Sequence, residues 1–446
     1  MPKEEFYTAP QDYTGPPHLP TLQISSCALL TFFLLCASQK LPFLIYVSFV
    51  PLLAAFIGRK DKGIFYYGCC IGVAQLITQL FSGVPFSTIM LLLPLFTGLW
   101  AWLNRKLYYY LAFPDVTTTL ADAPRRTFVL NWPKQLLLCF SGATLWCYFE
   151  WFLSEILKSP WSQLGISYNY PTISFFGNLP FFIIFVNMTI ATSLEYKLLL
   201  PQNKWNWQLP LFSLLLFLGS NLLCHYWRTE QQVPYHFDIG ILTAETSQKQ
   251  IKQADLFISP FLEDNSAKFS PPILSIKKDY KLAEITRGSE TIFAYRKIHT
   301  SNNAGLQYST LRFKDHVRLA INLGNDIIHS STVRQFIRNG ANIIIVLAKN
   351  PEILKRHCQC RSLENGVPVL LCSAKTIYLF MPNQTMTRFR KSTLIKIPMP
   401  DPIEPTFFYR QPKFQGRIVS LLTFLIFLIM GIHFINRKKT LYDLRQ

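Results

Sequence analysis

The stretch that decides the fold runs from Leu319 to Gln384 and reads LAINLGNDIIHSSTVRQFIRNGANIIIVLAKNPEILKRHCQCRSLENGVPVLLCSAKTIYLFMPNQ. Apolar runs of strand length alternate in it with polar segments, and Ile343–Leu347 is the clearest of these runs. A continuous run of β-branched residues is typical of a strand buried on both faces. The intervening segments Val333–Asn339 and Leu354–Asn365 suit helices, each stopped by a glycine. This alternation predicts a layered α/β fold.

Further strand candidates extend the α/β region in both directions. They are Phe237–Leu242, Leu256–Ser259, Thr291–Tyr295, Val317–Ile321, Val367–Cys372 and Ile377–Met381. We expect the whole region, residues 228–415, to form one domain, which is large enough to bury an adequate core.

The rest of the chain is strongly apolar. Of 446 residues, 50% are hydrophobic and only 15% are charged, which is less charge than a soluble protein usually carries. A helix needs about 20 apolar residues to cross the hydrocarbon layer of a membrane. Eight stretches approach this length: 21–38, 41–58, 64–81, 84–103, 135–153, 173–194, 208–226 and 416–435.

The spans predict a polytopic α-helical membrane protein with an inserted α/β domain. The expected parts are a cytoplasmic tail (1–20), a seven-helix bundle (21–227), the inserted domain (228–415), an eighth helix (416–436) and a basic tail (437–446). The first 20 residues are polar and rich in proline, unlike a cleavable signal peptide, so we expect the first span to be retained.

Lysine and arginine gather in alternate loops, which sets the expected orientation. Basic residues occupy the loops at 59–62, 105–134 and 197–204 and the tail after residue 436, whereas the loops around 39–40 and 83 have few. With eight spans, every basic loop falls on the same side. Both termini are then cytoplasmic and residues 228–415 lie outside.

The net charge of +19 is explained by this cytoplasmic rim, so the charge does not indicate nucleic-acid binding. We expect no cofactor and no metal. Cys358 and Cys360 would point about 200° apart on a helix and could not hold one ion together.

Short motifs in the membrane half and in the inserted domain share their order with one known family. Glu150-Trp151 lie at the end of the fifth span, Ser159-Pro160-Trp161 and Leu164-Gly165 follow it, and Arg361–Pro368 forms a turn from helix to strand. Thr406 and Tyr409-Arg410 precede the last span. Together they resemble the apolipoprotein N-acyltransferase family of bacterial inner-membrane enzymes.

The resemblance implies a seven-span bundle, a periplasmic nitrilase-like domain with α-β-β-α layers, and a final span. It also implies phospholipid and diacylated lipoprotein as partners. The family reaction uses a cysteine nucleophile, a glutamate base and a lysine that stabilises the oxyanion. Glu150, Trp151 and Trp161 would contact substrate, although an interfacial carboxylate and interfacial tryptophan anchors explain them equally well.

The sequence departs from the family at two of the three catalytic positions. Asn322 occupies the place of the nucleophile, and Phe261 occupies the place of the base. Lys297 matches the catalytic lysine, although an ordinary lysine at a strand end fits as well. Asn322 itself can be read as a residue that hydrogen-bonds a turn. Glu263 could replace the lost base.

The simplest interpretation is an inactive relative that binds lipid or lipoprotein, since losing the nucleophile of a covalent mechanism lowers kcat by about 10⁶-fold. The alternative is an active acyltransferase with a relocated site. Cys358, Cys360 and Cys372 are the cysteines of the inserted region that could serve it. A transporter or channel is disfavoured, because few charges lie within the spans.

Overall fold

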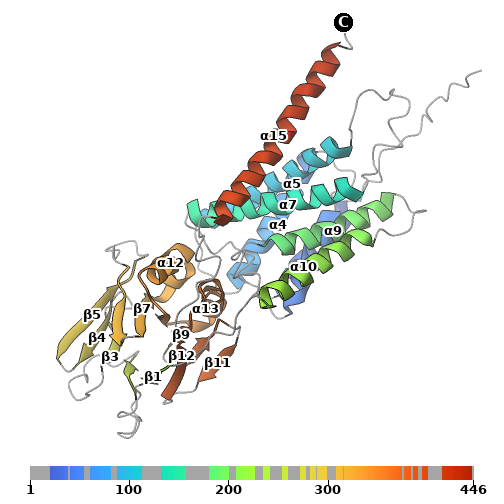
Figure 1. The fold of residues 1–446 in the computed structure, drawn as a ribbon. Helices are drawn as coiled ribbons and strands as arrows, with labels where there is room; N and C mark the ends of the chain where they lie inside the picture. The colour runs from blue at the N-terminus through green and yellow to red at the C-terminus, as the bar shows by residue number, and fades with distance from the viewer. Residues whose placement is uncertain are drawn as a thin grey trace, which may run out of the picture. The chain divides into compact units, whose positions relative to one another are not determined.

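The computed structural model describes residues 21–38, 41–54, 61–81, 88–112, 132–156, 180–199, 207–226, 235–241, 254–259, 272–277, 282–287, 289–298, 308–314, 316–373, 376–382, 385–389, 394–399 and 414–443. The chain divides into two compact units (Figure 1). Unit 1 comprises Met1–Gln163, Leu179–Gly219 and Gly416–Gln446, and its described elements are helices. Unit 2 comprises Leu164–Asn178 and Ser220–Gln415 and contains all the described strands.

Long described helices cover most of the predicted apolar stretches, and the last of them continues through the predicted basic tail as far as Asp443. They are α1 (Thr21–Ser38), α4 (Asp61–Phe81), α5 (Leu92–Ala112), α7 (Trp132–Trp151), α9 (Phe181–Leu199), α10 (Gln208–Tyr226) and α15 (Phe414–Asp443). Helix α5 begins eight residues after the start predicted at 84, because a short 3₁₀ turn, η2 (Thr88–Leu91), precedes it. A π-helical turn, η3 (Phe152–Ile156), extends α7.

The second predicted helix, at 41–58, is broken in the structure into η1 (Pro42–Leu44), α2 (Ile45–Ser48) and α3 (Val50–Ala54). The buried side chain of Asn187 in α9 stabilises the break. Its Oδ1 accepts a hydrogen bond from the Phe49 amide at 2.9 Å. Its Nδ2 donates to the carbonyl oxygens of Ile45 and Ile183, each at 2.8 Å. A side-chain amide thus replaces backbone pairing that the interrupted helix cannot supply.

Helices α4 and α5 approach closely through small residues. A Cβ added to Gly72 would lie 2.5 Å from the Cα of Pro94 and 2.4 Å from the Oγ1 of Thr97. A Cβ on Gly68 would lie 2.6 Å from that of Ala101. Gly68 and Gly72 form a Gly-x-x-x-Gly pair, the spacing that lets two apolar helices bring their backbones together.

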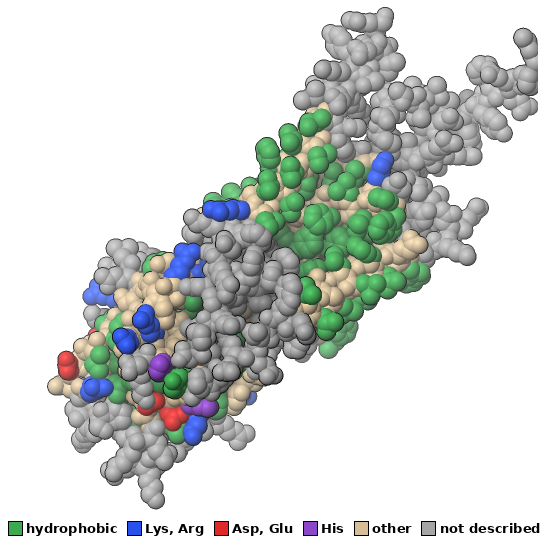
Figure 2. Space-filling view, in the orientation of Figure 1, with side chains coloured by type: hydrophobic (Ala, Val, Ile, Leu, Met, Phe, Trp, Pro, Cys, Tyr) green, Lys and Arg blue, Asp and Glu red, His purple; other side chains and the backbone are tan. Residues whose placement is uncertain are grey.

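Two described helices, Gly63–Leu80 and Trp132–Ser154, are long and apolar enough to cross a membrane. The other apolar helices in the described ranges are shorter: Ser25–Ser38, Ile45–Ala54, Phe181–Leu194, Gln208–Leu223 and Gly416–Ile429. Large apolar side chains remain exposed along these helices, and Figure 2 shows hydrophobic atoms covering the visible face of unit 1. The eight-span arrangement and its orientation stay predictions.

Unit 2 contains two six-stranded sheets. Sheet A has the order β12-β1-β2-β3-β4-β5, and sheet B has the order β11-β10-β9-β8-β7-β6. The strands of sheet A are β1 (Tyr235–Ile241), β2 (Leu256–Ser259), β3 (Ile273–Lys277), β4 (Leu282–Arg287), β5 (Glu290–Arg296) and β12 (Leu394–Met399). Those of sheet B are β6 (Leu311–Lys314), β7 (Val317–Leu323), β8 (Ile343–Leu347), β9 (Val369–Cys372), β10 (Ile377–Phe380) and β11 (Met386–Phe389).

Strands β7, β8 and β9 are parallel and form the buried centre of sheet B. Every side chain of Ile343–Leu347 in β8 is buried, as the continuous apolar run predicts. The two sheets pack against each other, since both β4 and β5 contact β7 and the ring of Phe237 lies 5.4 Å from that of Phe313.

Two helices pack beside sheet B. Helix α13 (Pro351–Asn365) contacts β9 and β10, and α12 (Ser330–Arg338) contacts α13. Gly366 has a φ of 71° and ends α13 in the left-handed conformation that glycine tolerates. These layers agree with the predicted α/β fold. A second helix layer, which the expected four-layer arrangement requires, is not among the residues that the structure describes.

Candidate functional site

The candidate site lies at the carboxyl end of β7, where the sequence places Asn322. This residue pairs in register with Val346 of the parallel strand β8, and its side chain is fully buried. Neither Oδ1 nor Nδ2 of Asn322 has a hydrogen-bond partner within the described part of the chain. A buried polar group without a partner costs about 1–3 kcal/mol, so this amide is an unusual feature at the end of an apolar strand.

Lys297 reaches the same strand end from sheet A. It follows β5 directly, and its Nζ lies 3.5 Å from the position that a Cβ would occupy on Gly324. Gly324 has a φ of 56° and begins the 3₁₀ turn η7 (Gly324–Ile328) after β7. Lys297 and Asn322, which the sequence resemblance singled out, therefore lie near one turn, with Asn322 two residues before the glycine beside Nζ.

A buried carboxylate fixes this arrangement. Asp326 in η7 accepts hydrogen bonds on Oδ2 from the hydroxyl of Tyr295 at 2.8 Å and from the backbone amide of Ile298 at 2.9 Å. Burial and the neighbouring Asp326 charge raise the pKa of Tyr295 far above its usual value, so the hydroxyl stays protonated and donates. Because Tyr295 and Ile298 flank Lys297, Asp326 holds the backbone that carries the lysine.

Helix α13 supports the same turn from its other side. The fully buried guanidinium of Arg361 donates to the carbonyl oxygens of Ile327 and Ile328, and it pairs with Glu364 at 2.5 Å. A buried ion pair is stable only when further hydrogen bonds satisfy its groups, and the two carbonyls supply them to the guanidinium. The Arg361–Pro368 motif therefore serves to hold η7.

The cysteines of unit 2 are poorly suited to nucleophilic attack. Cys358 and Cys360 in α13 and Cys372 in β9 are at most 1% exposed. Burial raises the pKa of each thiol well above its usual value. A thiol must lose its proton to act as a nucleophile, so these three groups are protonated and inert at neutral pH.

Two residues predicted at substrate contacts have structural partners within unit 1. The indole Nε1 of Trp146 donates to Oε1 of the buried Glu150 at 2.8 Å. The indole of Trp151 lies against the first turn of α15, where its Nε1 is 2.6 Å from the Cβ position of Gly416. Contact of either residue with substrate stays a prediction. Trp161, Phe261 and Glu263 lie outside the described residues.

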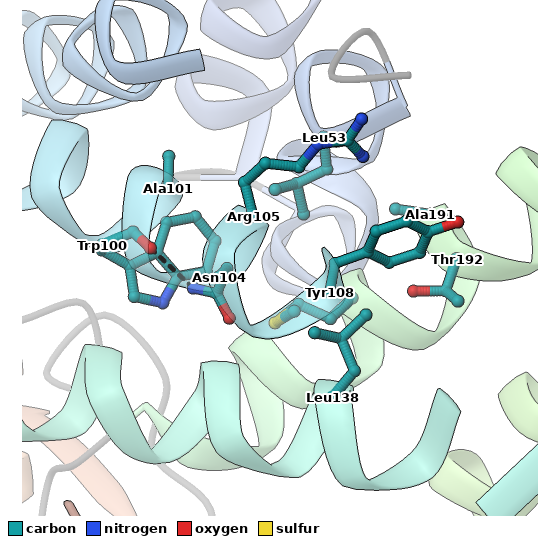
Figure 3. A pocket seen from close by; sticks show the side chains of 10 residues that line it. Leu53, Trp100, Ala101, Asn104, Arg105, Tyr108, Leu138, Ala191 and Thr192 are labelled. Carbon is teal, nitrogen blue, oxygen red and sulfur yellow. Dashed lines mark hydrogen bonds between the residues drawn. The ribbon is translucent and has the colours of Figure 1, made fainter. Parts of the chain in front are cut away.

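A cavity of about 60 Å³ lies within unit 1 between α3, α5, α7 and α9 (Figure 3). Its polar lining includes Asn104, whose Nδ2 donates to the Trp100 carbonyl at 2.8 Å, and Arg105, whose guanidinium lies 5.0 Å from the ring centre of Tyr108. The cavity has room for a few water molecules.

Comparisons with known proteins give structural neighbours and no sequence family. No family model matches the sequence, and no curated protein matches it. Among solved structures, the chain is similar to a variant of the Nesterenkonia AN1 amidase from the nitrilase superfamily, at 12% identity and a TM-score of 0.33. The match covers 42% of this chain and 98% of the amidase.

A second similar structure is Saccharomyces cerevisiae Nit3, described as a member of branch 10 of the nitrilase superfamily. It is 12% identical with a TM-score of 0.29, and the match covers 40% of this chain and 93% of Nit3. Likenesses at this level say nothing about catalysis, ligand or membrane association.

The sequence did not predict a role for Asp326. Neither its spacing nor its neighbours in the sequence distinguish it from an ordinary carboxylate in a loop.

Proposed function

We propose that this protein is a bacterial inner-membrane relative of the apolipoprotein N-acyltransferases that binds phospholipid and lipoprotein without transferring an acyl chain. The observation that carries the proposal is the buried Asn322 at the end of β7, beside the turn that Lys297 approaches. The family places its nucleophile at this position. The two sheets of unit 2 and the order of the sequence motifs support a nitrilase-like domain.

The chemistry of Asn322 argues against acyl transfer. The lone pair of an amide nitrogen is delocalised, so the side chain cannot attack an ester as a thiolate does. Asp326, Tyr295 and Arg361 nevertheless keep the turn in a fixed geometry. An ordered turn that lacks the nucleophile could still bind the family's ligands, phospholipid and lipoprotein, without reacting with them.

A relocated active site would need another reactive group. Cys358, Cys360 and Cys372 are the candidates from the sequence, and their burial and raised pKa values make attack by any of them unfavourable. The binding role is therefore the better supported of the two proposals.

The exposed apolar surface of unit 1 supports the membrane location. Leu215, Leu218, Phe424 and Ile429 are each more than half exposed, in α10 and α15. Exposed apolar surface on this scale is unfavourable in water and favourable against lipid chains. We propose that these helices lie in the inner membrane and that residues 228–415 are periplasmic. Phospholipid and diacylated lipoprotein are the proposed partners, with neither cofactor nor nucleic acid.

The deciding experiment uses the purified full-length protein in phospholipid nanodiscs that contain phosphatidylethanolamine. A diacylated lipopeptide is added, its binding is measured, and mass spectrometry follows the appearance of a third acyl chain. We expect saturable binding and no triacylated product. A product that depends on Cys372 would establish the relocated enzyme instead, and absence of any binding would refute the proposed role in lipoprotein recognition.

A further inference from the structure

The further inference concerns the cavity of unit 1 that Figure 3 shows. It lies between α3, α5, α7 and α9, and of the ten described residues that line it, Arg105 carries a positive charge and none is acidic. We infer that this cavity binds the phosphate group of an anionic phospholipid from the cytoplasmic leaflet. The inference rests on the proposed membrane location of unit 1 and goes beyond the proposed role in lipoprotein binding, which concerns unit 2.

The cavity lies near the helix ends that the proposed topology places at the cytoplasm. The lining residue Leu138 is six residues after the start of α7, and Arg105 is seven residues before the end of α5. At a rise of about 1.5 Å per residue, both positions are about 10 Å from those helix ends. Arg105 and Lys106 are also consecutive charges, which favour the place where a helix leaves the hydrocarbon layer. The cavity is therefore expected at the level of the lipid headgroups.

The polar groups of the lining can donate hydrogen bonds to an anion. The guanidinium of Arg105 is partly exposed and lies 5.0 Å from the ring centre of the buried Tyr108. The hydroxyls of Tyr108 and Thr192 are further donors among the lining residues. Hydrogen bonds from a guanidinium to phosphate oxygens are charge-assisted and strong, so this set of donors favours a phosphate group over a neutral ligand.

Helix α7 supplies a second cation and a lipid-facing surface. Lys134 precedes Leu138 by four residues, so both lie on the same face of α7, and Lys134 is one turn nearer to the predicted cytoplasmic end. The neighbouring Leu137 is 46% exposed, so this part of α7 would face lipid chains in a membrane. Basic pockets between membrane helices on the cytoplasmic side commonly bind the headgroups of anionic lipids.

The rest of the lining favours a lipid over a free phosphate ion. Asn104 donates its Nδ2 to the Trp100 carbonyl at 2.8 Å, so this donor is already used within α5. The other lining residues are apolar: Leu53, Trp100, Ala101, Leu138, Met188 and Ala191. A free ion would bring its whole hydration shell to these apolar walls, whereas a lipid presents a phosphate attached to apolar chains. The volume of about 60 Å³ leaves those chains outside the cavity, against the exposed face of α7.

Native mass spectrometry of the purified full-length protein in detergent tests the inference. Dioleoyl phosphatidylglycerol is compared with dioleoyl phosphatidylethanolamine, which has the same chains and no net charge. We expect the wild-type protein to bind phosphatidylglycerol about tenfold more tightly, an effect within the range for a hydrogen bond to a charged group. Inorganic phosphate at a comparable concentration should not displace the bound lipid.

The variant Arg105→Gln removes the charge and keeps a long polar side chain, so it should bind the two lipids equally. Arg417→Gln is the matched control, because it removes one positive charge from an exposed position of α15 and should keep the preference. The first turn of α15 contacts Trp151, which is 13 residues and about 20 Å along α7 from Leu138. Thr192→Val keeps the side-chain volume, removes one hydroxyl, and should weaken phosphatidylglycerol binding by a smaller factor.

Equal wild-type affinities for the two lipids would overturn the inference, and this comparison stays decisive if Arg105→Gln does not fold. A preference that persists in folded Arg105→Gln, or that Arg417→Gln loses to the same extent, would also overturn it. Displacement of the lipid by inorganic phosphate would assign the cavity to a soluble anion instead. The proposed function would stand after any of these results, because lipopeptide binding by the wild-type protein tests it separately.

Discussion

Asp326 is the residue on which the geometry of the site depends, and Tyr295 makes half of its connection to β5. Tyr295→Phe removes the hydroxyl donor and leaves a buried carboxylate oxygen with one hydrogen bond fewer. We expect the free energy of unfolding to fall by about 1.5–3 kcal/mol, the range for a hydrogen bond to a charged group. Tyr378→Phe is the matched control, since its hydroxyl pairs with Glu352, whose side chain is 61% exposed. Thermal unfolding in detergent should show a smaller loss of stability for Tyr378→Phe than for Tyr295→Phe. Equal losses of stability would contradict the proposal that Asp326 holds the end of β5 through Tyr295.

The buried His357 should make the free energy of unfolding depend on pH. Burial, reinforced by the charges of Arg361, His329 and Arg356, lowers the pKa of this histidine well below 6.5, so it is neutral in the folded protein. In the unfolded chain it takes up a proton below about pH 6.5. Acid therefore favours the unfolded state, and stability should decrease by about 1.4 kcal/mol per pH unit below pH 6.5, until the pH reaches the folded pKa.

The test of this pH effect compares unfolding midpoints between pH 7.5 and pH 5 for the wild type and His357→Gln. The variant should lose the part of the decrease that this histidine causes. A wild-type slope that persists in His357→Gln would show that other groups cause the acid sensitivity.

At the scale of single elements, the sequence predicts the strands and helix ends that are determined by residues close together in the chain. The apolar run of β8 and the glycine that ends α13 are both confirmed by the structure. Strand β12 was not predicted, because it pairs with β1 about 160 residues earlier in the chain and has no strong pattern of its own. The break at Phe49 depends on Asn187 in another helix, which hydropathy cannot reveal.

The candidate site likewise depends partly on contacts between elements that are distant in the sequence. The resemblance singled out Lys297 and Asn322, and the structure brings Lys297 to the turn that follows Asn322. Asp326 and the unpaired state of the Asn322 amide depend on contacts between elements, so sequence patterns could not predict them.

The helix pair α4–α5 offers a prediction about packing. A Cβ at position 72 would meet the backbone of Pro94, which cannot move unless the helices separate, so Gly72→Ala should destabilise the protein by about 1–3 kcal/mol. Gly219→Ala in α10 is the matched control. Among the residues that the structure describes, no atom outside its own stretch of helix lies within 4 Å of its Cβ position, and alanine favours helix by up to about 1 kcal/mol. Equal unfolding temperatures for the two variants in detergent would contradict close packing at Gly72.

At the scale of the whole molecule, the two units present opposite kinds of surface. Unit 1 exposes leucine and phenylalanine on α10 and α15, whereas unit 2 buries the apolar strands of sheet B and carries charged side chains on its visible surface (Figure 2). Surfaces of these two kinds suit two different solvents, lipid and water. This contrast is the physical basis for expecting one unit in the membrane and the other beside it.

The orientation of the chain gives the last prediction. Because Arg437, Lys438 and Lys439 lie near the C-terminal end of α15, after its apolar stretch, we expect the C-terminus to remain in the cytoplasm. A fluorescent reporter that folds only in the cytoplasm should be bright when fused after Gln446. A phosphatase that is active only outside should be active when inserted within Ser301–Gly305 and inactive when fused after Gln446. An active phosphatase at the C-terminus, or an inactive one in unit 2 of a stably produced protein, would reverse the proposed topology and remove the α/β unit from the periplasm.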